Sequence, residues 1–283
     1  MASQGRNGGT VKALWRYPVK SMAGNKLDKA RVTEGGILGD RAYAVLDGTS
    51  GRVGSAKTPR KWAALMTLAA DFVSPPEAGA PLPPVRVVWP DGTEATSDGG
   101  DADARLSRML GRPVTLTAER PETPSLERLD PLAEEETIVD IGDLMMAGRF
   151  SDYAALHLIT TATMARLAAL RPESTFTARR FRPNVTIATP DGETGFVENG
   201  WVGRELAIGD AVRLRISDPT PRCSVPTIAQ KDMEKDPHVL RTIVEHNRLP
   251  VPLLDGESLP CAGVYAFVIQ AGTVKRGDAV RVI

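Results

Sequence analysis

One cysteine lies in a segment whose residue types suit metal or thiol chemistry. Cys223 stands in Asp-Pro-Thr-Pro-Arg-Cys-Ser-Val-Pro-Thr, residues 218–227, where three prolines keep the backbone stiff and non-helical. Arg222 directly precedes the thiol, and a fixed positive charge favours the thiolate, the form that binds metals and attacks electrophiles. We therefore treat Cys223 as a candidate metal ligand or nucleophile. The alternative interpretation is a small buried hydrophobic residue, which is the usual fate of a free cysteine.

Three separate basic sites could bind a phosphate. Lys20 and Ser21 follow the first expected strand, Arg41 follows a glycine-rich turn, and Arg182 and Asn184 precede another strand. A lysine, a hydroxyl and an arginine fork together make a good phosphate cradle. Each site taken alone is also explained by a solvated surface charge, and Asn184 by an amide that stabilises its own turn.

Composition argues against several classes of protein. The chain has 35 basic and 35 acidic residues and a formal net charge of zero, which argues against a nucleic-acid or anionic-membrane partner. No apolar run approaches the length of a membrane span, and the first ten residues lack the apolar core of a secretory signal. Two cysteines build neither a disulfide framework nor a four-cysteine iron–sulfur cluster. We therefore expect a cytoplasmic protein that receives any electrons it uses from another chain or a soluble donor.

The strand and turn patterns predict a mainly β protein with a few helices, in the α+β class. Alternating β-forming residues bounded by turn residues predict strands at 11–19, 26–32, 42–46, 85–89, 93–96 and 185–188. Helices are expected over 101–111, over 162–170 after a Thr160 or Thr161 cap, and over 236–247, whereas 62–70 fit either a short helix or a buried strand. Gly-Asp-Ala-Val-Arg occurs at 209–213 and again at 277–281, each time as a turn before a strand. Such units suit a barrel that closes on itself.

Two segments predict the domain limits. Residues 1–10 are polar and glycine-rich, which predicts a disordered tail. Residues 121–136 are acidic and contain proline, which predicts a solvated linker. We therefore expect an N-terminal domain over 11–120 and a second domain over 137–283.

The order of the short motifs adds a resemblance to a known family. The chain resembles the MOSC-domain proteins, which include the mitochondrial amidoxime-reducing component and its bacterial relatives. The resemblance extends from about Val11 to Ile283. The motifs that carry it are Tyr17-Pro18-Val19-Lys20-Ser21, Gly39-Asp40-Arg41, Arg180-Phe181-Arg182-Pro183-Asn184, Pro221-Arg222-Cys223 with Thr227, and Gly263-Val264-Tyr265-Ala266 with Gly272-Thr273-Val274-Lys275-Arg276-Gly277-Asp278.

The resemblance implies a fold and a cofactor. The fold is a smaller, β-rich N-terminal MOSC-associated domain followed by a MOSC β-barrel. The cofactor is the molybdenum cofactor, a labile pterin whose dithiolene holds the metal. Carried onto this chain, Cys223 completes the coordination of the metal, as suits a soft thiolate, and Arg222 flanks it. Lys20, Ser21 and Arg41 hold the cofactor phosphate.

Three further residues are assigned by the same resemblance. Arg182 and Asn184 hydrogen-bond the pterin or its phosphate, and Thr160 adds a hydroxyl at a helix N-terminus. The implied activity is the reduction of small N-hydroxylated substrates, with electrons from a separate flavin or iron–sulfur reductase. One alternative is a carrier that passes on the cofactor, or persulfide sulfur on Cys223, without turnover of its own. Another is a scaffold that binds a different phosphorylated ligand.

The remaining titratable residues have plainer interpretations. His157 lies in an apolar setting, so a satisfied core histidine is favoured over a catalytic one. His238 and His246 are eight residues apart and do not form a chelating pair on one helical turn. Cys261 precedes a buried strand and is expected to be structural.

Overall fold

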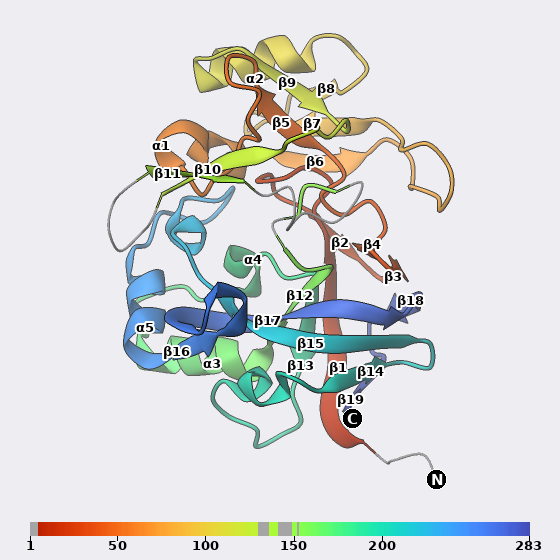
Figure 1. Ribbon diagram of the computed structural model, residues 1–283, viewed down its shortest axis with the longest axis vertical. Helices are drawn as coiled ribbons and strands as arrows, with labels where there is room; N and C mark the ends of the chain where they lie inside the picture. Colours follow the sequence, from red (N-terminus) through yellow and green to blue (C-terminus); the bar gives the residue numbers. More distant parts are fainter. Residues whose placement is uncertain (1–4, 130–135, 141–148, 152) are drawn as a thin grey trace.

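The structure is a computed structural model that describes residues 5–129, 136–140, 149–151 and 153–283. Within these ranges the chain is mostly β-strand with five α-helices. Figure 1 shows a barrel formed mainly by the second half of the chain, with a smaller β-rich unit stacked at one end of it. The predicted fold class is therefore confirmed.

Seven strands close into a barrel. Each strand pairs with its neighbours in the order β12, β13, β1, β19, β14, β15 and β17, and β17 pairs back onto β12. All of these pairings are antiparallel except β12 with β13, which needs a crossover connection and receives one from α3 and α4. The barrel strands are β1 (Arg6–Arg16), β12 (Leu156–Thr160), β13 (Val185–Ala188), β14 (Glu205–Ile208), β15 (Val212–Pro221), β17 (Glu257–Gln270) and β19 (Ala279–Val282). β2 (Asn25–Leu27) and β16 (Arg248–Val251) pair outside this ring with β1 and β17.

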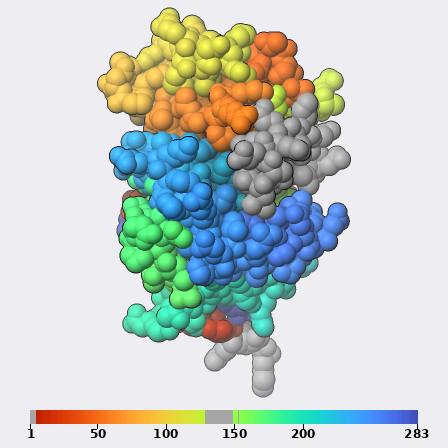
Figure 2. Space-filling view, turned by 90° about the vertical axis from the view of Figure 1, so that its left-hand side faces the viewer, coloured from red at the N-terminus to blue at the C-terminus, as the bar shows by residue number. Residues whose placement is uncertain are grey.

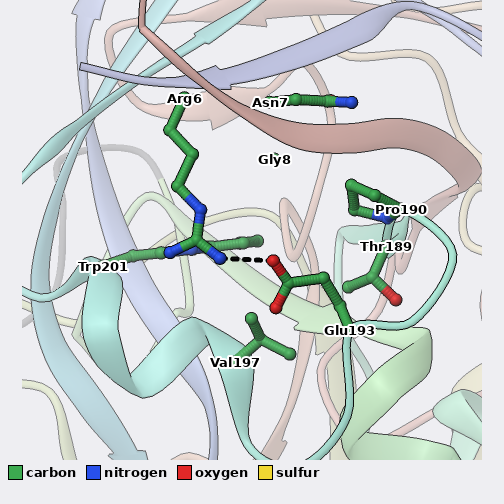
Figure 3. Close-up of a pocket in the computed structure, with 8 residues that line it drawn as sticks. All are labelled: Arg6, Asn7, Gly8, Thr189, Pro190, Glu193, Val197 and Trp201. Atoms are coloured by element: carbon green, nitrogen blue, oxygen red, sulfur yellow. Dashed lines mark hydrogen bonds and ion pairs between the residues drawn. The ribbon is translucent and has the colours of Figure 1, made fainter.

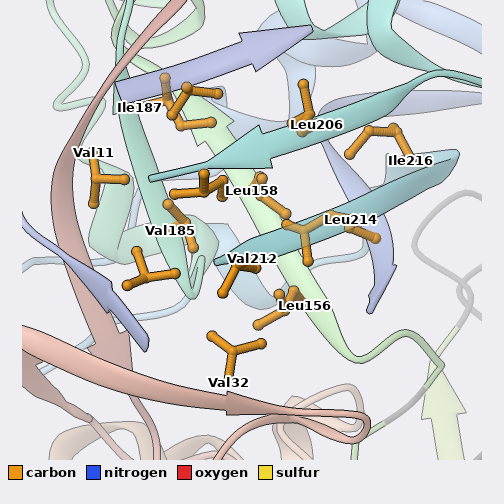
Figure 4. Close-up of a cluster of buried hydrophobic side chains, with 14 of the residues drawn as sticks. Val11, Val32, Leu156, Leu158, Val185, Ile187, Leu206, Val212, Leu214 and Ile216 are labelled. Atoms are coloured by element: carbon orange, nitrogen blue, oxygen red, sulfur yellow. The ribbon is translucent and has the colours of Figure 1, made fainter. Parts of the chain in front are cut away.

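Alternation along the strands fills the barrel. In β15, Val212, Leu214 and Ile216 are buried while the residues between them are exposed or half-buried, as the two-residue period of a strand requires. These side chains meet Leu158 and Val185 from the facing strands (Figure 4). Burying an aliphatic side chain of this size stabilises the fold by about 1.5–3 kcal/mol. The barrel interior is therefore a packed core.

The N-terminal unit has a core of its own. Its strands are β5 (Ala44–Asp47) with β9 (Val114–Thr117), and β6 (Ala69–Phe72) with β7 (Val85–Val88) and β8 (Glu94–Thr96). α1 (Pro59–Trp62), the 3-10 helix η1 (Ala63–Thr67) and α2 (Ala102–Leu110) pack with them around the buried Trp62, Leu65 and Leu106. α2 starts at Asp101 and ends at Gly111, whose φ of 64° suits glycine, so the helix predicted over 101–111 is confirmed. For residues 62–70 the sequence allowed either a short helix or a buried strand. The structure has both in succession, because the 3-10 helix η1 leads into the strand β6.

The other helices cover the barrel. They are α3 (Thr161–Leu170), α4 (Ala178–Phe181), α5 (His238–His246) and the 3-10 helices η2 (Val197–Trp201), η3 (Val225–Thr227) and η4 (Pro252–Leu254). α3 and α5 share a buried cluster around Ile159 and Leu167. A third small sheet joins β18 (Gly272–Lys275), β3 (Lys29–Thr33) and β4 (Gly36–Ile37), so the early strand β3 pairs with a strand near the C-terminus.

Two boundary predictions differ from the structure. The tail prediction is wrong for residues 6–10, because β1 begins at Arg6 and pairs with both β13 and β19. The barrel closes only if this strand fills the gap, and Gly9 allows it, since a Cβ there would lie 1.9 Å from the Ala188 carbonyl oxygen. The predicted linker 121–136 contains the strand β10 (Ser125–Leu129), which pairs with β11 (Glu136–Asp140) at and beyond its end, while 130–135 lie outside the described residues. The first strand of the chain thus belongs to the barrel.

A small pocket lies beside β1. Figure 3 shows this pocket, where Arg6 forms an ion pair with Glu193 beside Trp201. Its lining includes none of the predicted site residues.

Candidate cofactor site

The loop after β1 holds the first two predicted site residues. Lys20 is buried, and its Nζ donates a hydrogen bond of 2.9 Å to the carbonyl oxygen of Phe150. Ser21 has a φ of 64°, and its Oγ accepts a hydrogen bond of 3.0 Å from the backbone N–H of Ala56. A hydroxyl that accepts one bond still has a proton to donate. Both side chains are therefore held in place by segments distant in sequence.

Arg41 is positioned through its neighbour Asp40. The fully buried Asp40 carboxylate accepts hydrogen bonds from the backbone N–H of Tyr17 at 2.8 Å, from Arg149 Nη2 at 2.6 Å and from Arg41 Nη1. Burial alone would raise the pKa of Asp40, but the positive charges of Arg41 and Arg149 outweigh it, so the pKa lies below its ordinary value. The backbone N–H of Arg41 also donates to the Tyr17 carbonyl at 2.6 Å.

The guanidinium groups of Arg182 and Arg41 both lie over the ring of Tyr17. Arg41 Nη2 donates to the Arg182 carbonyl oxygen at 3.3 Å, and Arg182 Nη1 donates to the Met22 carbonyl oxygen at 2.6 Å. The guanidinium carbons of Arg41 and Arg182 lie 4.8 and 4.3 Å from the centre of the Tyr17 ring. Both distances fall within the range of cation–π attraction. Two arginines from different halves of the chain are thus gathered on one face of the barrel.

Three of these residues share an unusual backbone conformation. Ser21, Arg41 and Arg182 have φ values of 64°, 50° and 54°, in the left-handed region that non-glycine residues rarely adopt. Each such residue costs about 1–3 kcal/mol, and such residues cluster at ligand-binding and active sites. Two of the three also have guanidinium groups stacked on Tyr17. The fold therefore holds these side chains in fixed positions at the expense of local strain.

The Arg222–Cys223 segment lies on the other side of Arg182. Arg222 follows the end of β15, and its Nη1 donates to the Phe181 carbonyl oxygen at 3.2 Å while its Nε donates to the Ala262 carbonyl oxygen at 2.8 Å. Phe181 directly precedes Arg182, so the same left-handed turn contacts Arg222 on one side and Arg41 on the other. The structure thus brings the predicted phosphate residues and the Cys223 segment to one region.

The two cysteines differ as the sequence analysis predicted. Cys223 is partly exposed, whereas Cys261 is buried in β17. Burial raises the pKa of the Cys261 thiol to about 11, so this group stays protonated at neutral pH. Cys223 is therefore the thiol that a ligand can reach.

The pKa values of Tyr17 and His157 are both influenced by the positive charges of nearby arginines. Burial raises the pKa of Tyr17 to about 12, and the charges of Arg182 and Arg41 oppose this rise. Burial and the charges of Arg222 and Arg41 hold the pKa of His157 well below its ordinary value. Arginine charge thus bears on both groups, so the site favours an anionic ligand.

Two predicted cofactor residues perform other tasks. The Asn184 side chain accepts from the backbone N–H of His157 at 3.1 Å and donates to the Trp15 carbonyl at 3.3 Å, so it joins β12 to β1. Thr160 is the N-cap of α3, but its hydroxyl donates at 2.6 Å to the buried carboxyl group of Glu198. Glu198 also accepts from Thr163 at 2.7 Å. A side chain of the protein therefore occupies the anion position at this helix N-terminus.

Replacing Thr160 tests this reassignment. Thr160→Val is expected to lower the free energy of unfolding by about 1–3 kcal/mol, because Glu198 and the N-terminus of α3 each lose a buried hydrogen bond. The measurement is urea unfolding together with the bound cofactor content. Thr161→Val, which changes a half-buried neighbour, is the matched control. A stable Thr160→Val protein that loses cofactor would instead restore Thr160 to the ligand set.

Four residues of the site were not predicted as site residues. Tyr17 and Asp40 lie within the motifs quoted above, but nothing in their local sequence shows that they pack against arginines from elsewhere. Arg149 has no local signal, because its partner Asp40 is 109 residues away. His157 is a buried histidine, as favoured, yet it contacts Arg222. Their common feature is a partner that is distant in sequence.

The described part of the chain offers neither a side-chain cluster that could hold a metal nor a helix that could span a membrane. No three His, Cys, Asp or Glu side chains in this part come together in a way that could hold a metal ion. Among its helices, none combines the length and apolar character needed to cross a bilayer.

Two known domain families match the chain. The MOSC domain family matches residues 147–281, and the MOSC N-terminal beta barrel domain family matches residues 8–77. The chain is a MOSC-domain protein with an N-terminal MOSC-associated β-barrel domain.

The chain is also similar to individual proteins. The chain is 27% identical over 297 residues to human mitochondrial amidoxime-reducing component 1, covering 96% of this chain and 82% of that protein. It is 23% identical over 290 residues to rat mitochondrial amidoxime reducing component 2, with the same coverage of 96% and 82%. Among solved structures, the YuaD protein from Bacillus subtilis aligns over 97% of this chain and 94% of that one, with 12% identity and a TM-score of 0.45. A score this low carries no functional argument.

Proposed function

We propose that the chain binds the molybdenum cofactor at this site and reduces N-hydroxylated compounds with electrons from a separate flavin or iron–sulfur reductase. The observation that carries the proposal is the strained backbone of Ser21, Arg41 and Arg182, three residues that the family resemblance assigns to the cofactor. The MOSC family match and the similarity to amidoxime-reducing components support the choice of cofactor and substrate class. A cytoplasmic location stays a prediction.

The residues present fit such a cofactor. The partly buried guanidinium of Arg222 donates to two backbone carbonyls and to His157, and within the described residues no carboxylate forms an ion pair with it. A desolvated cation with neutral partners favours a nearby anion. Next to Cys223, the Oγ atom of Ser224 is buried and has no hydrogen-bond partner among the residues that the structure describes. Both features suit an anionic, hydrogen-bonding ligand beside the thiol.

Each residue has a defined task in the proposed site. Lys20, Ser21, Arg41 and Arg182 would hold the phosphate through charge-assisted hydrogen bonds. Cys223 would hold the metal as a thiolate. When bound, the cofactor supplies the redox chemistry that removes oxygen from the substrate. Because the chain has only two cysteines, it cannot build a four-cysteine cluster, and we expect the electrons to come from another protein.

Two arginines three residues apart provide the test. Arg182→Gln is expected to lower the molybdenum and pterin content at least about tenfold, which corresponds to the loss of roughly 1.4 kcal/mol of binding. Arg179→Gln removes a half-buried arginine that pairs with the exposed Asp232, and it should retain the cofactor. The measurement is metal analysis and pterin fluorescence of protein from a host that synthesises the cofactor. A wild-type protein without molybdenum, or equal loss in both variants, would refute the proposed site.

An assay of substrate reduction distinguishes an enzyme from a cofactor carrier. Cofactor-loaded protein should reduce a simple amidoxime when a flavin or iron–sulfur reductase is supplied. Release of intact cofactor to an acceptor protein, with no reduction under any donor, would identify a carrier instead.

A further inference from the structure

The second half of β17 is apolar on both of its faces. The side chains that belong to the barrel core or pack against it are Val264, Ala266 and Val268. The alternate residues Tyr265, Phe267 and Ile269 therefore lie on the outside of the barrel, because successive side chains of a strand point to opposite faces. An antiparallel strand at a protein surface usually has polar residues on its outer face. We call these three residues the β17 strip.

A β-bulge accompanies the most exposed residue of the β17 strip. In the pairing of β15 with β17, Arg213 lies opposite Gln270 and Leu214 lies opposite Val268, so Ile269 is the extra residue of the bulge. The Ile269 residue is 46% exposed. Among the described residues, it is the one exposed large hydrophobic residue that belongs to the barrel. Exposed apolar surface beside charged residues is typical of an interaction site.

Two exposed arginines of β15 flank the β17 strip. Arg215 lies directly opposite Phe267, and Arg213 lies opposite Gln270, on strands that run side by side in Figure 1. Arg215 approaches Glu205 at 3.8 Å, whereas no carboxylate of the described residues forms an ion pair with Arg213. Aromatic residues and arginines are enriched at protein–protein interfaces. The two positive charges favour a partner with an acidic surface.

A series of rings connects the β17 strip with the proposed cofactor site. The ring centre of Tyr153 lies 5.5 Å from that of Phe267 and 5.4 Å from that of Tyr265. The Tyr265 ring in turn lies 6.2 Å from the ring of His157, which is hydrogen-bonded to Arg222. A protein docked on the strip would therefore stand at the outer end of a series of contacts that ends at the neighbour of the proposed metal ligand.

Tyr153 is held in place over the β17 strip. Its hydroxyl donates to the carboxylate of the buried Asp218 at 3.0 Å. The other oxygen of that carboxylate accepts from the backbone N–H of Leu253 at 3.1 Å. The aromatic part of the surface is therefore ordered before a partner binds, which lowers the entropic cost of association.

We propose that the outer side of β15 and β17, centred on Phe267 and Ile269, is the docking surface for an electron-donor protein that is acidic where it binds. The inference rests on the proposed function, which requires electrons from another protein. Reduction of an N-hydroxyl group to N–H takes up two electrons and two protons and releases water. The docked donor supplies the electrons and is oxidised, and the solvent supplies the protons. An anionic membrane is a less suitable partner, because the chain has no excess of basic residues.

The dependence of turnover on donor concentration tests this proposal. Cofactor-loaded protein is assayed with reduced flavodoxin and with reduced plant-type ferredoxin, both acidic donors, and separately with reduced methyl viologen, a small donor that needs no docking surface. Ile269→Asp is expected to raise the concentration of acidic donor at half-maximal rate at least about tenfold, because it places a negative charge within the apolar strip. The viologen-driven rate and the molybdenum content should not change. Val73→Asp, which alters a residue of the N-terminal unit that is 49% exposed, is the matched control.

Arg213→Glu tests the charge of the surface and leaves its apolar residues in place. It is expected to raise the same donor concentration at least about threefold and to weaken the dependence of turnover on salt, because an attraction becomes a repulsion. Arg166→Glu, which reverses the charge of an exposed arginine on α3, is the control. This variant also covers the case in which Ile269→Asp does not fold.

The outcomes separate this inference from the proposed function. Unchanged donor dependence in both variants, with viologen-driven turnover intact, would overturn the docking surface alone. Turnover with viologen but with neither acidic donor would do the same. A wild-type protein without viologen-driven turnover would defeat the proposed function and this inference together. Binding to vesicles of anionic phospholipid that is lost in both variants would replace the protein partner by a membrane.

Discussion

Asp40→Asn is expected to lower the free energy of unfolding by about 3–5 kcal/mol, the usual effect of removing one partner from a buried ion pair. The Asp40 carboxylate is fully buried and accepts from Arg41, from Arg149 and from the backbone of Tyr17. The substitution leaves two guanidinium groups without their anion while changing the side-chain volume little. Since Arg41 and Tyr17 belong to the proposed cofactor site, the variant should also bind less cofactor.

Urea unfolding checks this prediction, with Asp71→Asn as the control. Asp71 pairs with Arg16 at 3.5 Å, but its side chain is 39% exposed, so its loss should cost about 1 kcal/mol or less. A cost for Asp40→Asn no larger than that of the control would contradict the role assigned to Asp40.

The Asp40 carboxylate should also make the stability of the folded protein sensitive to acid. The pKa of Asp40 is lower in the folded protein than its ordinary value of about 3.9. Its contribution to the free energy of unfolding is therefore complete once the pH is above about 3.9. The contribution is lost as the pH falls through the lower pKa of the folded state. Below about pH 4 the wild type should therefore lose stability more steeply than Asp40→Asn. Parallel pH profiles for the two proteins would show that Asp40 does not titrate in this way.

Cys223→Ala is expected to remove bound molybdenum and abolish reductase activity while the protein stays folded. The Cys223 thiol is partly exposed, whereas the Cys261 thiol is buried. Cys223 follows the end of the barrel strand β15 and belongs to neither of the two main hydrophobic cores, so its loss removes little buried contact. The measurements are molybdenum content, amidoxime reduction and thermal unfolding. Cys261→Ala is the matched control, since it deletes the buried thiol and should retain the metal. Full turnover by Cys223→Ala would rule out the thiolate as a required ligand.

Local sequence determined those features whose causes lie within a few residues. The end of α2 at Gly111 follows from the left-handed backbone that glycine adopts easily, and the alternation in β15 follows from the two-residue period of a strand. The distinction between Cys223 and Cys261 was also accessible, because Cys223 follows an arginine in a proline-rich segment and Cys261 is followed by an apolar run. Motif order along the chain indicated the MOSC family.

Tertiary structure decided which side chains face the site. Thr160 looked like an anion-binding cap, but Glu198 reaches its hydroxyl from 38 residues away, and Asn184 reaches Trp15 from 169 residues away. Residues 6–10 looked disordered because glycines lower strand propensity, yet closing the barrel supplies their partners. Such pairings depend on contacts made when distant strands come together, which no local propensity encodes. The sequence alone therefore determined the element types and the family, whereas the partners of His157, Asp40 and Arg182 became definite only in the folded chain.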